Sequence, residues 1–423
     1  MDSSKLKTYL IAGISVICLV TLYMLTSNTI PTPVNIADQL NQPSDINKYT
    51  SIDENNSDVL YQSFSKHQNI CTSDSFNEGK WIHQSVGLDS YTVDGINSYS
   101  GYHCNWDFPH RCYRRDSPAE FNRSKAIIDY SWQPNDCMVF PFEATKFSRH
   151  LSQNPLLLVG DSITQLMFES LWCLLGQDMV SQDKDTGLSG GDTTMWISQL
   201  VHKDIKEAGD IATDKPPEAS IAYIRSDYLV KLDDFSLIKP NEGEGYQIGV
   251  GNNFPWVQAL PRFRYIMINT GPHWHPDLKW GPNRNRAELL TAFKKAMRKV
   301  YNYLKNHIRD DQIVWVRSTP YGHANCSQYT APSDHIIKPM GRKKEYEWDM
   351  FESFDFAWKE MIEKENDPRF QFFNVTLSNY RGDAHSSPDN DCLHTCLPGP
   401  VDDWNKLLFH EVTKLVVEKY ENS

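Results

Sequence analysis

The stretch LLLVGDSITQLMFESLWCLLG, residues 156–176, decides the fold. It opens with an unbroken apolar run that ends at Gly160, which is typical of a buried strand. From 163 to 175, leucine, phenylalanine and isoleucine recur at helical spacing. A strand that turns directly into a helix is the repeating unit of α/β folds. Active sites in such sheets collect at the carboxyl ends of the strands, so the turn at 160–162 is the first candidate site.

The rest of the chain continues this alternation. Further short strand candidates are 221–225, 265–269, 313–317 and 370–375. Apolar residues recur on one face of 286–308 and 404–420, as they do in amphipathic helices. Strands that alternate with helices predict an α/β fold with a parallel sheet covered by helices on both faces.

Composition excludes several classes of protein. The chain has 423 residues, which is enough for one large α/β domain or two ordinary domains. Hydrophobic residues make up 40% and charged residues 23%, as in globular rather than disordered proteins. The net charge of −12 repels phosphate backbones, so we expect no nucleic acid partner.

An uncharged apolar segment, 8–25, lies near the start of the chain. Its length is just enough to cross a membrane and suits the thinner early secretory membranes. Lys5 and Lys7 precede it and no basic residue follows until Lys48, so the positive-inside rule places 1–7 in the cytosol and the rest in the lumen. A cleaved signal peptide is the alternative. Residues 26–33 offer no small-residue cleavage site, which favours an uncleaved single-pass anchor.

Three segments follow the predicted anchor. Residues 26–70 are rich in Asn, Ser, Asp, Pro and Thr, which predicts a flexible lumenal stem. In 71–141, aromatic residues and cysteines are interleaved with little helical periodicity, which predicts a loop-rich subdomain held by disulfides. Residues 142–423 carry the alternating pattern and form the predicted catalytic domain.

The cysteines support an oxidising compartment. Cys18 lies in the apolar segment, and an even number lies beyond it, which predicts disulfides. The alternative is a mixture of buried thiols and a metal site, but no Cys-x-x-Cys or paired histidine spacing is present, so we predict no metal. The cysteines beyond the anchor are Cys71, Cys104, Cys112, Cys137, Cys173, Cys326, Cys392 and Cys396. Four sequons compatible with the lumen begin at Asn55, Asn122, Asn325 and Asn374.

Ser162 is the candidate nucleophile. It follows Gly160 and Asp161 where the best strand candidate opens into a helix, and helix amino ends favour negative charge. Acyl transfer needs a nucleophilic hydroxyl beside donors for the developing oxyanion. The alternative is an ordinary strand-to-helix turn in which Asp161 or Ser162 only caps the helix.

Asp391 and His394 are the candidate partners of the serine. A serine needs a histidine as base, and a carboxylate must hold the tautomer of that histidine. The two residues are three apart in a short loop that Cys392 and Cys396 could pin through disulfides. The alternative is a polar loop with a solvated histidine.

A third group follows the strand candidate at 265–269. The amide of Asn269 and a backbone N–H beside Gly271 could donate to an oxyanion, although an Asn-containing turn at a strand end is the alternative. Tryptophan faces stack on sugar rings, but core packing explains such residues as well. The candidate substrate-binding residues are His273, Trp274, His275 and Arg225, and Asp161 is assigned with the oxyanion group.

Together these motifs resemble the trichome birefringence-like family of polysaccharide O-acetyltransferases, within the PC-esterase and SGNH/GDSL hydrolase group. The similarity extends from Cys71 to the C-terminus, and its final block is the most specific. The matching motifs are Cys71, Phe76, Gly79, Trp81, Cys104, Cys112, WQPNDC at 132–137, the stretch at 156–176, MINTGPHWH at 267–275 and DCLHTCLPGPVDDWNKLL at 391–408.

The resemblance implies an SGNH-like fold and a defined chemistry. Ser162 would be the nucleophile, His394 the base and Asp391 its orienting carboxylate, with Asn269 in the oxyanion site. The reaction would pass through an acetyl-serine intermediate. The chain would be a single-pass type II protein of the Golgi, or another secretory membrane, with a lumenal catalytic domain. The implied disulfides are Cys71–Cys137, Cys104–Cys173, Cys112–Cys396 and Cys326–Cys392.

The resemblance also implies the partners. The acceptor would be a polysaccharide or glycan, and no cofactor would stay bound. The co-substrate would be acetyl-CoA or another lumenal acetyl carrier, supplied through a separate transporter because one span cannot import acetyl groups. The chain departs from the family pattern at 165–167, at Pro272 and in 181–218, which resembles an insertion, so the sequence does not specify the glycan.

Two alternatives to the transferase remain. A carbohydrate or lipid esterase would use the same triad with water as the acceptor. A non-catalytic glycan-binding protein would keep the triad only as a relic.

Overall fold

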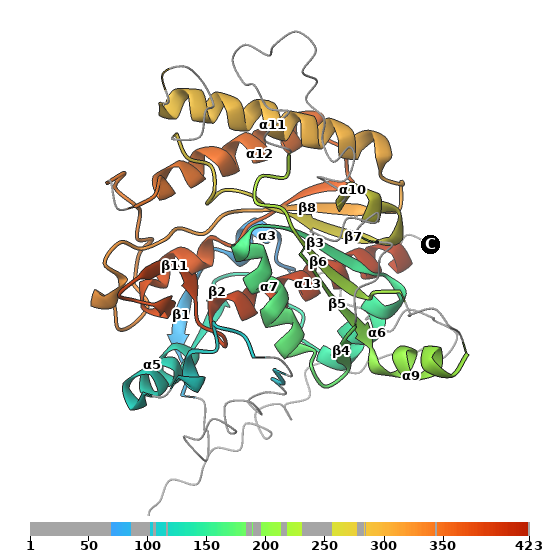
Figure 1. The fold of residues 1–423 in the computed structure, drawn as a ribbon, viewed down its shortest axis with the longest axis horizontal. Coiled ribbons are helices and arrows are strands. Elements are labelled where there is room, and N and C mark those ends of the chain that lie inside the picture. The colour runs from blue at the N-terminus through green and yellow to red at the C-terminus, as the bar shows by residue number, and fades with distance from the viewer. Residues whose placement is uncertain are drawn as a thin grey trace, which may run out of the picture. The chain divides into compact units, whose positions relative to one another are not determined.

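A seven-stranded sheet, in the order β4-β5-β6-β3-β7-β8-β9, forms the centre of the computed structural model (Figure 1). The structure describes residues 69–85, 102–104, 107–115, 117–182, 188, 196–212, 218–230, 256–276, 283, 285–342 and 345–421. The predicted cytosolic tail and anchor, the stem up to residue 68, and Asn55 lie outside these residues. No helix within the described ranges combines the length and apolar character needed to cross a membrane.

The parallel part of the sheet confirms the predicted α/β architecture. Its five strands are β3 (Leu156–Gly160), β6 (Ile221–Arg225), β7 (Tyr265–Ile268), β8 (Ile313–Arg317) and β9 (Phe370–Phe373). Two antiparallel strands extend one side, β4 (Met179–Ser181) and β5 (Ile197–His202). Both antiparallel strands fall in or beside the segment that resembles an insertion, and the sequence analysis did not predict them.

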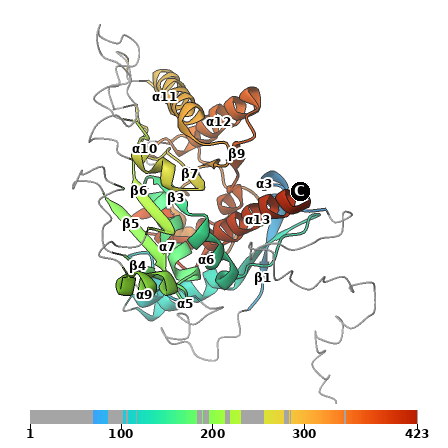
Figure 2. The ribbon, with the colours of Figure 1, turned by 90° about the vertical axis from the view of Figure 1, so that its right-hand side faces the viewer.

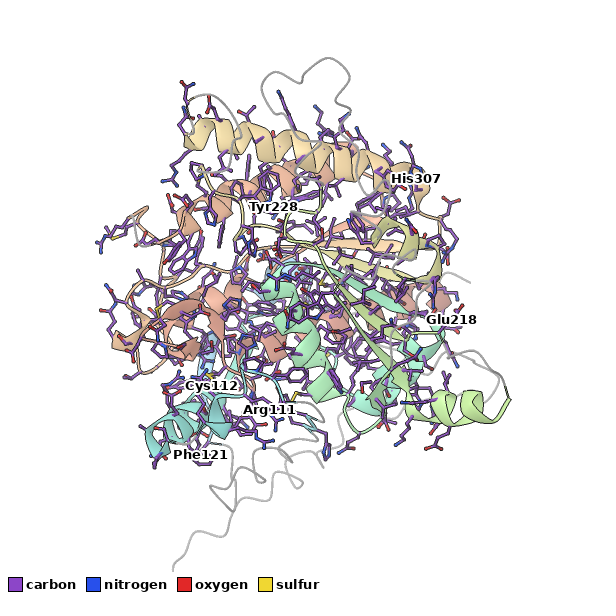
Figure 3. All side chains as sticks on the ribbon, in the orientation of Figure 1. Arg111, Cys112, Phe121, Glu218, Tyr228 and His307 are labelled. Atoms are coloured by element: carbon purple, nitrogen blue, oxygen red, sulfur yellow. A yellow bond between two sulfur atoms is a disulfide. The ribbon has the colours of Figure 1, made fainter. Side chains whose placement is uncertain are left out.

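Helices cover both faces of the sheet because the strand side chains alternate between the two faces. Leu156 and Leu158 join the core under one set of helices, while Leu157 and Val159 join the core under the other. The first set is α6 (Ala144–Gln153), α7 (Ser162–Leu174) and α13 (Pro400–Glu421). The second is α10 (Trp256–Ala259), α11 (Arg286–His307) and α12 (Phe351–Glu365). Figure 2 shows these two layers on opposite sides of the strands, and Figure 3 shows side chains filling the space between them.

Residues 71–141 contain more regular structure than the predicted loops. They form α3 (Ser73–Phe76), β1 (Gly79–His83), α5 (Pro118–Ile128) and β2 (Tyr130–Pro134). Strands β1 and β2 pair antiparallel, with Trp81 opposite Trp132. Phe76 and Trp132 belong to the same core as α7 and α13, so this segment packs directly on the helices that cover the central sheet.

The remaining elements shape the loops. A hairpin of β10 (His385–Ser387) and β11 (Asp391–Thr395) precedes α13, and α9 (Lys203–Ala212) follows β5. The short 3₁₀ helices are η2 (Cys112–Arg114), η3 (Leu260–Arg262), η4 (Cys326–Gln328), η5 (Trp348–Met350), η6 (Thr376–Tyr380) and η7 (Gly382–Ala384).

Four disulfides join the described elements, in the same pairs that the resemblance implies. They are Cys71–Cys137, Cys104–Cys173, Cys112–Cys396 and Cys326–Cys392. Two of them attach the β10–β11 region to earlier parts of the chain, which bears directly on the site below.

Candidate active site

Ser162, His394 and Asp391 meet at the carboxyl edge of the parallel strands. Nε2 of His394 lies 2.8 Å from Oγ of Ser162, and its Nδ1 lies 2.7 Å from Oδ2 of Asp391. The side chain of His394 is 20% exposed and that of Asp391 is 37% exposed, so solvent reaches the group. The structure therefore brings together the three side chains that the sequence analysis selected.

The turn between β3 and α7 positions the serine. A Cβ on Gly160 would lie 2.3 Å from Oγ1 of Thr164, so only glycine allows α7 to begin this close to β3. Oδ1 of Asp161 accepts from the backbone N–H of Ile163 at 2.9 Å and caps the helix. Ser162 is therefore the first residue of α7, where the helix dipole favours a developing negative charge.

Electrostatics keep Asp391 ionised. The backbone N–H groups of Leu393 and His394 donate to its Oδ1 at 3.0 and 3.2 Å. Burial alone would raise the pKa of Asp391, but the His394 ring and these N–H groups together hold it well below its ordinary value. The carboxylate can thus keep the ring proton of His394 on Nδ1, which leaves the Nε2 lone pair facing Ser162.

Covalent links hold the loop that carries Asp391 and His394. Cys392 bonds to Cys326, whose backbone N–H also donates to the Cys392 sulfur at 3.1 Å. Cys396 bonds to Cys112, labelled in Figure 3, from the N-terminal part of the chain. The loop is therefore attached at two points, Cys392 and Cys396, which limits the drift that would separate Asp391 and His394 from Ser162.

Two buried histidines support the back of this loop. Nδ1 of His385 lies 3.3 Å from the carbonyl oxygen of His394, and its Nε2 lies 2.6 Å from Nδ1 of His323. Burial lowers the pKa of His323 to about 4 and that of His385 well below its ordinary value. Both rings are therefore neutral at neutral pH and place no charge behind His394.

A second imidazole–carboxylate pair lies against the triad, and the sequence analysis missed it. The ring of His110 stacks on that of His394, with centroids 5.4 Å apart and 17° between the planes. Nδ1 of His110 lies 2.9 Å from Glu169, a carboxylate with 3% exposure that also accepts from Gln165 at 2.9 Å. The spacing of Gln165 and Glu169 on one face of α7 was a usable signal. Nothing local pointed to His110 except its closeness to Cys112.

The amide of Asn269 differs from its predicted role. Its Nδ2 donates to the carbonyl oxygen of Arg317 at 2.8 Å and to Oγ1 of Thr319 at 3.0 Å, while its Oδ1 accepts from Arg317 at 2.9 Å. The side chain is buried, and both amide hydrogens are engaged. In this structure Asn269 holds the buried Arg317 and has no hydrogen left for an oxyanion.

Three other predicted residues lie in the protein interior. Asp161 is fully buried and caps α7, so it does not face a substrate. Gly271 is buried, and a Cβ there would lie 2.9 Å from Oγ1 of Thr319. Trp274 is 1% exposed, and its ring packs against Phe293 of α11. The alternative of core packing is correct for Trp274.

The remaining substrate-binding candidates are half-exposed. Arg225 donates through Nε to Oδ1 of Asp227 at 2.9 Å, and Nε2 of His273 lies 3.7 Å from the same oxygen. Nδ1 of His275 lies 3.0 Å from Glu347, in a separate pair. Arg225 and His273 thus share one carboxylate, and His275 belongs to another group.

The sequons differ in exposure. Asn122 on α5 and Asn325 before η4 are exposed. Asn374 is half-buried, and its Nδ2, the atom that would carry a glycan, donates to Asp74 at 3.1 Å. Glycosylation at Asn122 and Asn325 is therefore sterically easier than at Asn374.

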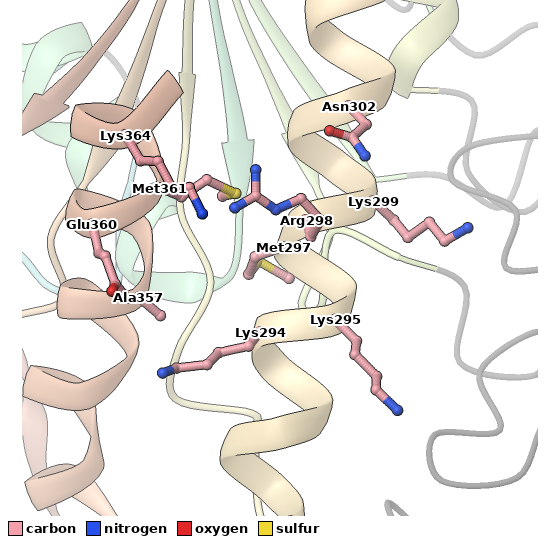
Figure 4. Close-up of a pocket in the computed structure, with 10 residues that line it drawn as sticks. All are labelled: Lys294, Lys295, Met297, Arg298, Lys299, Asn302, Ala357, Glu360, Met361 and Lys364. Atoms are coloured by element: carbon pink, nitrogen blue, oxygen red, sulfur yellow. The ribbon is translucent and has the colours of Figure 1, made fainter. Parts of the chain in front are cut away.

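A groove of about 590 Å³ lies between α11 and α12 (Figure 4). None of the predicted site residues lines it. Its lining is Lys294, Lys295, Met297, Arg298, Lys299, Asn302, Ala357, Glu360, Met361 and Lys364. Across the described ranges, no cluster of three or more His, Cys, Asp or Glu side chains could hold a metal ion.

Comparison with known proteins gives one family. The model of the PC-Esterase family, described as a GDSL/SGNH-like acyl-esterase family found in Pmr5 and Cas1p, matches residues 140–411. This range contains the triad, the seven-stranded sheet and the helices that cover it, except the last residues of α13.

Three curated relatives illustrate the similarity. Trichome birefringence-like 9 of Arabidopsis thaliana is 24% identical over 383 residues, which cover 84% of this chain and 87% of that protein. Xyloglucan O-acetyltransferase 1 of the same plant is 22% identical, with 87% and 90% covered. Xylan O-acetyltransferase 3 of Oryza sativa subsp. japonica is 22% identical, with 67% and 66% covered.

Proposed function

Since the chain belongs to the PC-Esterase family of GDSL/SGNH-like acyl-esterases, we propose that it transfers acetyl groups to hydroxyls of a polysaccharide through an acetyl-Ser162 intermediate. The observation that carries the proposal is the contact of 2.8 Å between Nε2 of His394 and Oγ of Ser162, with Asp391 on the other ring nitrogen. Two relatives that align with 87% and 67% of this chain, at 22% identity, are named as O-acetyltransferases of xyloglucan and xylan.

The first half of the reaction loads the serine. Oγ of Ser162 attacks the carbonyl carbon of the acetyl donor and gives its proton to Nε2 of His394. The His394 imidazolium, stabilised by Asp391, returns this proton to the leaving group as the donor bond breaks. Backbone N–H groups at the amino end of α7 are the proposed oxyanion donors, since the amide of Asn269 is engaged with Arg317 and Thr319.

The second half releases the acetyl group. A sugar hydroxyl gives its proton to Nε2 of His394 and attacks the acetyl carbonyl, and the same proton then returns to Ser162 as the ester breaks. The donor would be acetyl-CoA or another lumenal acetyl carrier. We place the enzyme on a Golgi or other secretory membrane with a lumenal domain, and the four disulfides support an oxidising compartment.

Esterase activity is the second candidate, and the family description as acyl-esterases favours it. The same acetyl-serine would then react with water instead of a sugar hydroxyl. The two functions differ only in the second acceptor, so the test must measure both products.

The test adds an acetyl donor, first acetyl-CoA and then 4-nitrophenyl acetate, and analyses the digested protein by mass spectrometry. We expect one added acetyl group on the peptide that contains Ser162, and none in Ser162→Ala. Adding a glycan should discharge the acetyl group and yield acetylated sugar. Free acetate alone, at a rate that glycan does not change, would favour the esterase. An unmodified Ser162 peptide with both donors would refute the intermediate.

A further inference from the structure

One exposed tryptophan lies on the same edge of the sheet as the triad. Trp196 directly precedes β5 and is 53% exposed, although large apolar side chains in the described chain are mostly buried. A singly exposed aromatic residue is common and needs no function by itself. Its position and its neighbours are what distinguish Trp196.

Backbone pairing fixes that position. Gly160 of β3 pairs with Arg225 of β6, and the backbone N–H of Arg225 donates to the carbonyl oxygen of Trp196 at 3.0 Å. Gly160, Arg225 and Trp196 therefore lie side by side on adjacent strands. Gly160 in turn precedes Ser162 by two residues. The distance from β3 to β5 is two strand spacings, about 10 Å.

The side chains also share one face of the sheet. Arg225 alternates with Tyr223, whose ring stacks on Phe168 of α7, so both point to the α7 side. Trp196 lies opposite Arg225, and the Arg225 guanidinium is 5.8 Å from the centre of the Trp196 ring. Trp196 and Arg225 thus flank the end of α7 that carries Ser162.

The arginine is itself held in place. Oδ1 of Asp227 accepts from Arg225 at 2.9 Å, and the backbone carbonyl of Asp227 accepts from Oγ1 of Thr270 at 2.6 Å. His273 faces the same carboxylate, and its ring meets the edge of the Tyr228 ring, labelled in Figure 3. The Trp196 ring is therefore bordered by oriented polar groups that can bond hydroxyls.

The geometry points to a glycan-binding platform in which one sugar ring of the acceptor stacks on Trp196 while Arg225 and Asp227 bond its hydroxyls. The C–H groups on a pyranose face carry partial positive charge and match the negative π-face of an indole. This inference rests on the proposed function for the identity of the ligand. The distance of about 10 Å between β3, which leads to Ser162, and β5, which follows Trp196, exceeds the length of one sugar ring. The sugar that stacks on Trp196 is therefore not the one that is acetylated.

The test measures binding separately from chemistry. The full chain is titrated calorimetrically with xylohexaose and cellohexaose, as unbranched β-linked probes. Trp196→Ala should raise the Kd about five- to tenfold, and Trp196→Phe should recover most of the affinity because it keeps a ring face. Phe356→Ala is the matched control. Phe356 is 62% exposed on α12, and this helix contacts β9, at the opposite edge of the sheet from β4 and β5.

A second measurement uses acetyl transfer to the same sugars and to the monosaccharides xylose and glucose. Trp196→Ala should raise the KM for the hexasaccharides and leave the KM for the monosaccharides unchanged, because one ring is shorter than the distance of about 10 Å between strands β3 and β5. Wild type that binds neither hexasaccharide, or a Trp196→Ala variant with unchanged Kd, would overturn the platform. Wild type that binds through Trp196 but transfers no acetyl group would contradict the proposed function and leave the platform supported.

Discussion

At Asp391, one carboxylate decides which nitrogen of His394 carries a proton. An amide at this position could still accept from the backbone N–H groups of 393 and 394, but its NH₂ would face Nδ1 of His394. The ring proton would then sit on Nε2, pointing at Ser162, and the base would be lost. The backbone hydrogen bonds to residue 391 would remain, but His394 could no longer take the proton from Ser162.

We therefore expect Asp391→Asn to slow acetyl-Ser162 formation about 10³- to 10⁴-fold with little loss of stability. The measurement is the pre-steady-state release of nitrophenol from 4-nitrophenyl acetate. Asp389→Asn, at an exposed carboxylate in the same loop, is the control and should react like wild type. A loss below tenfold for Asp391→Asn would mean that another group sets the tautomer.

At the residue scale, the sequence selected side chains that lie together where short local patterns mark them. Ser162 follows a strand and opens a helix, and Asp391 with His394 forms a compact pair, so both could be found from short segments. The orientation of Asn269 could not, because Arg317 and Thr319, about 50 residues away, take its amide hydrogens. His110 stacks on His394 across a long sequence distance, next to the Cys112–Cys396 disulfide, and no local pattern specifies this pairing.

Among the elements, the β10–β11 hairpin that carries Asp391 and His394 is joined to an earlier part of the chain by the Cys326–Cys392 disulfide. Cys326–Cys392 and Cys71–Cys137 both span 66 residues, which makes them a matched pair. Loop entropy predicts that each stabilises the fold by about 4 kcal/mol. Only the first adjoins Asp391.

Replacing both cysteines of either pair by alanine should therefore cost similar stability, measured by urea unfolding. Acetyl-Ser162 formation at 10 °C should fall at least about tenfold for the Cys326/Cys392 variant, because the loop loses its anchor. The Cys71/Cys137 variant should retain its rate. Equal rate losses in the two variants would show that the disulfides act only through global stability.

Elements were predicted best where periodicity is strong. The buried parallel strands and the long amphipathic helices, such as α11, agree with the sequence analysis. Strand β4 has three residues and forms the edge of the sheet, and β5 lies between β4 and β6. Their segment has no clear period, so tertiary pairing, of β5 with β6 and of β4 with β5, creates these strands. The β1–β2 pair was likewise hidden, because GKWIH and YSWQP mix polar and aromatic residues without strict alternation.

Over the whole molecule, charge is distributed unevenly. The chain carries a net charge of −12, yet half of the residues that line the groove between α11 and α12 are lysine or arginine and only Glu360 is acidic (Figure 4). No pattern of apolar periodicity predicts such a surface, because solvent-facing residues of a helix are chosen independently of the core.

The N-terminal segment is joined to the last helix through one imidazole. Nε2 of His410 on α13 donates to the carbonyl oxygen of Cys71 at 2.8 Å, and its Nδ1 accepts from the backbone N–H of Phe140 at 3.1 Å. The bond from Phe140 needs the neutral ring, because a protonated Nδ1 has no lone pair with which to accept it. Burial lowers the pKa of His410 to about 4, compared with about 6.5 for an unfolded histidine.

The sign of the pH dependence follows from these values. Between pH 6.5 and 4 the unfolded chain binds a proton at His410 and the folded chain does not. The contribution of His410 to the free energy of unfolding is therefore complete above pH 6.5 and is lost as the pH falls toward 4. Glutamine offers a carbonyl and an NH₂ without titrating. Relative to His410→Gln, wild type should lose about 2 kcal/mol of unfolding free energy from pH 7.5 to 5, measured with urea. His335→Gln, at an exposed imidazole, is the control. If the difference in unfolding free energy between wild type and His410→Gln stays constant with pH, the neutral His410 ring does not stabilise the fold in this way.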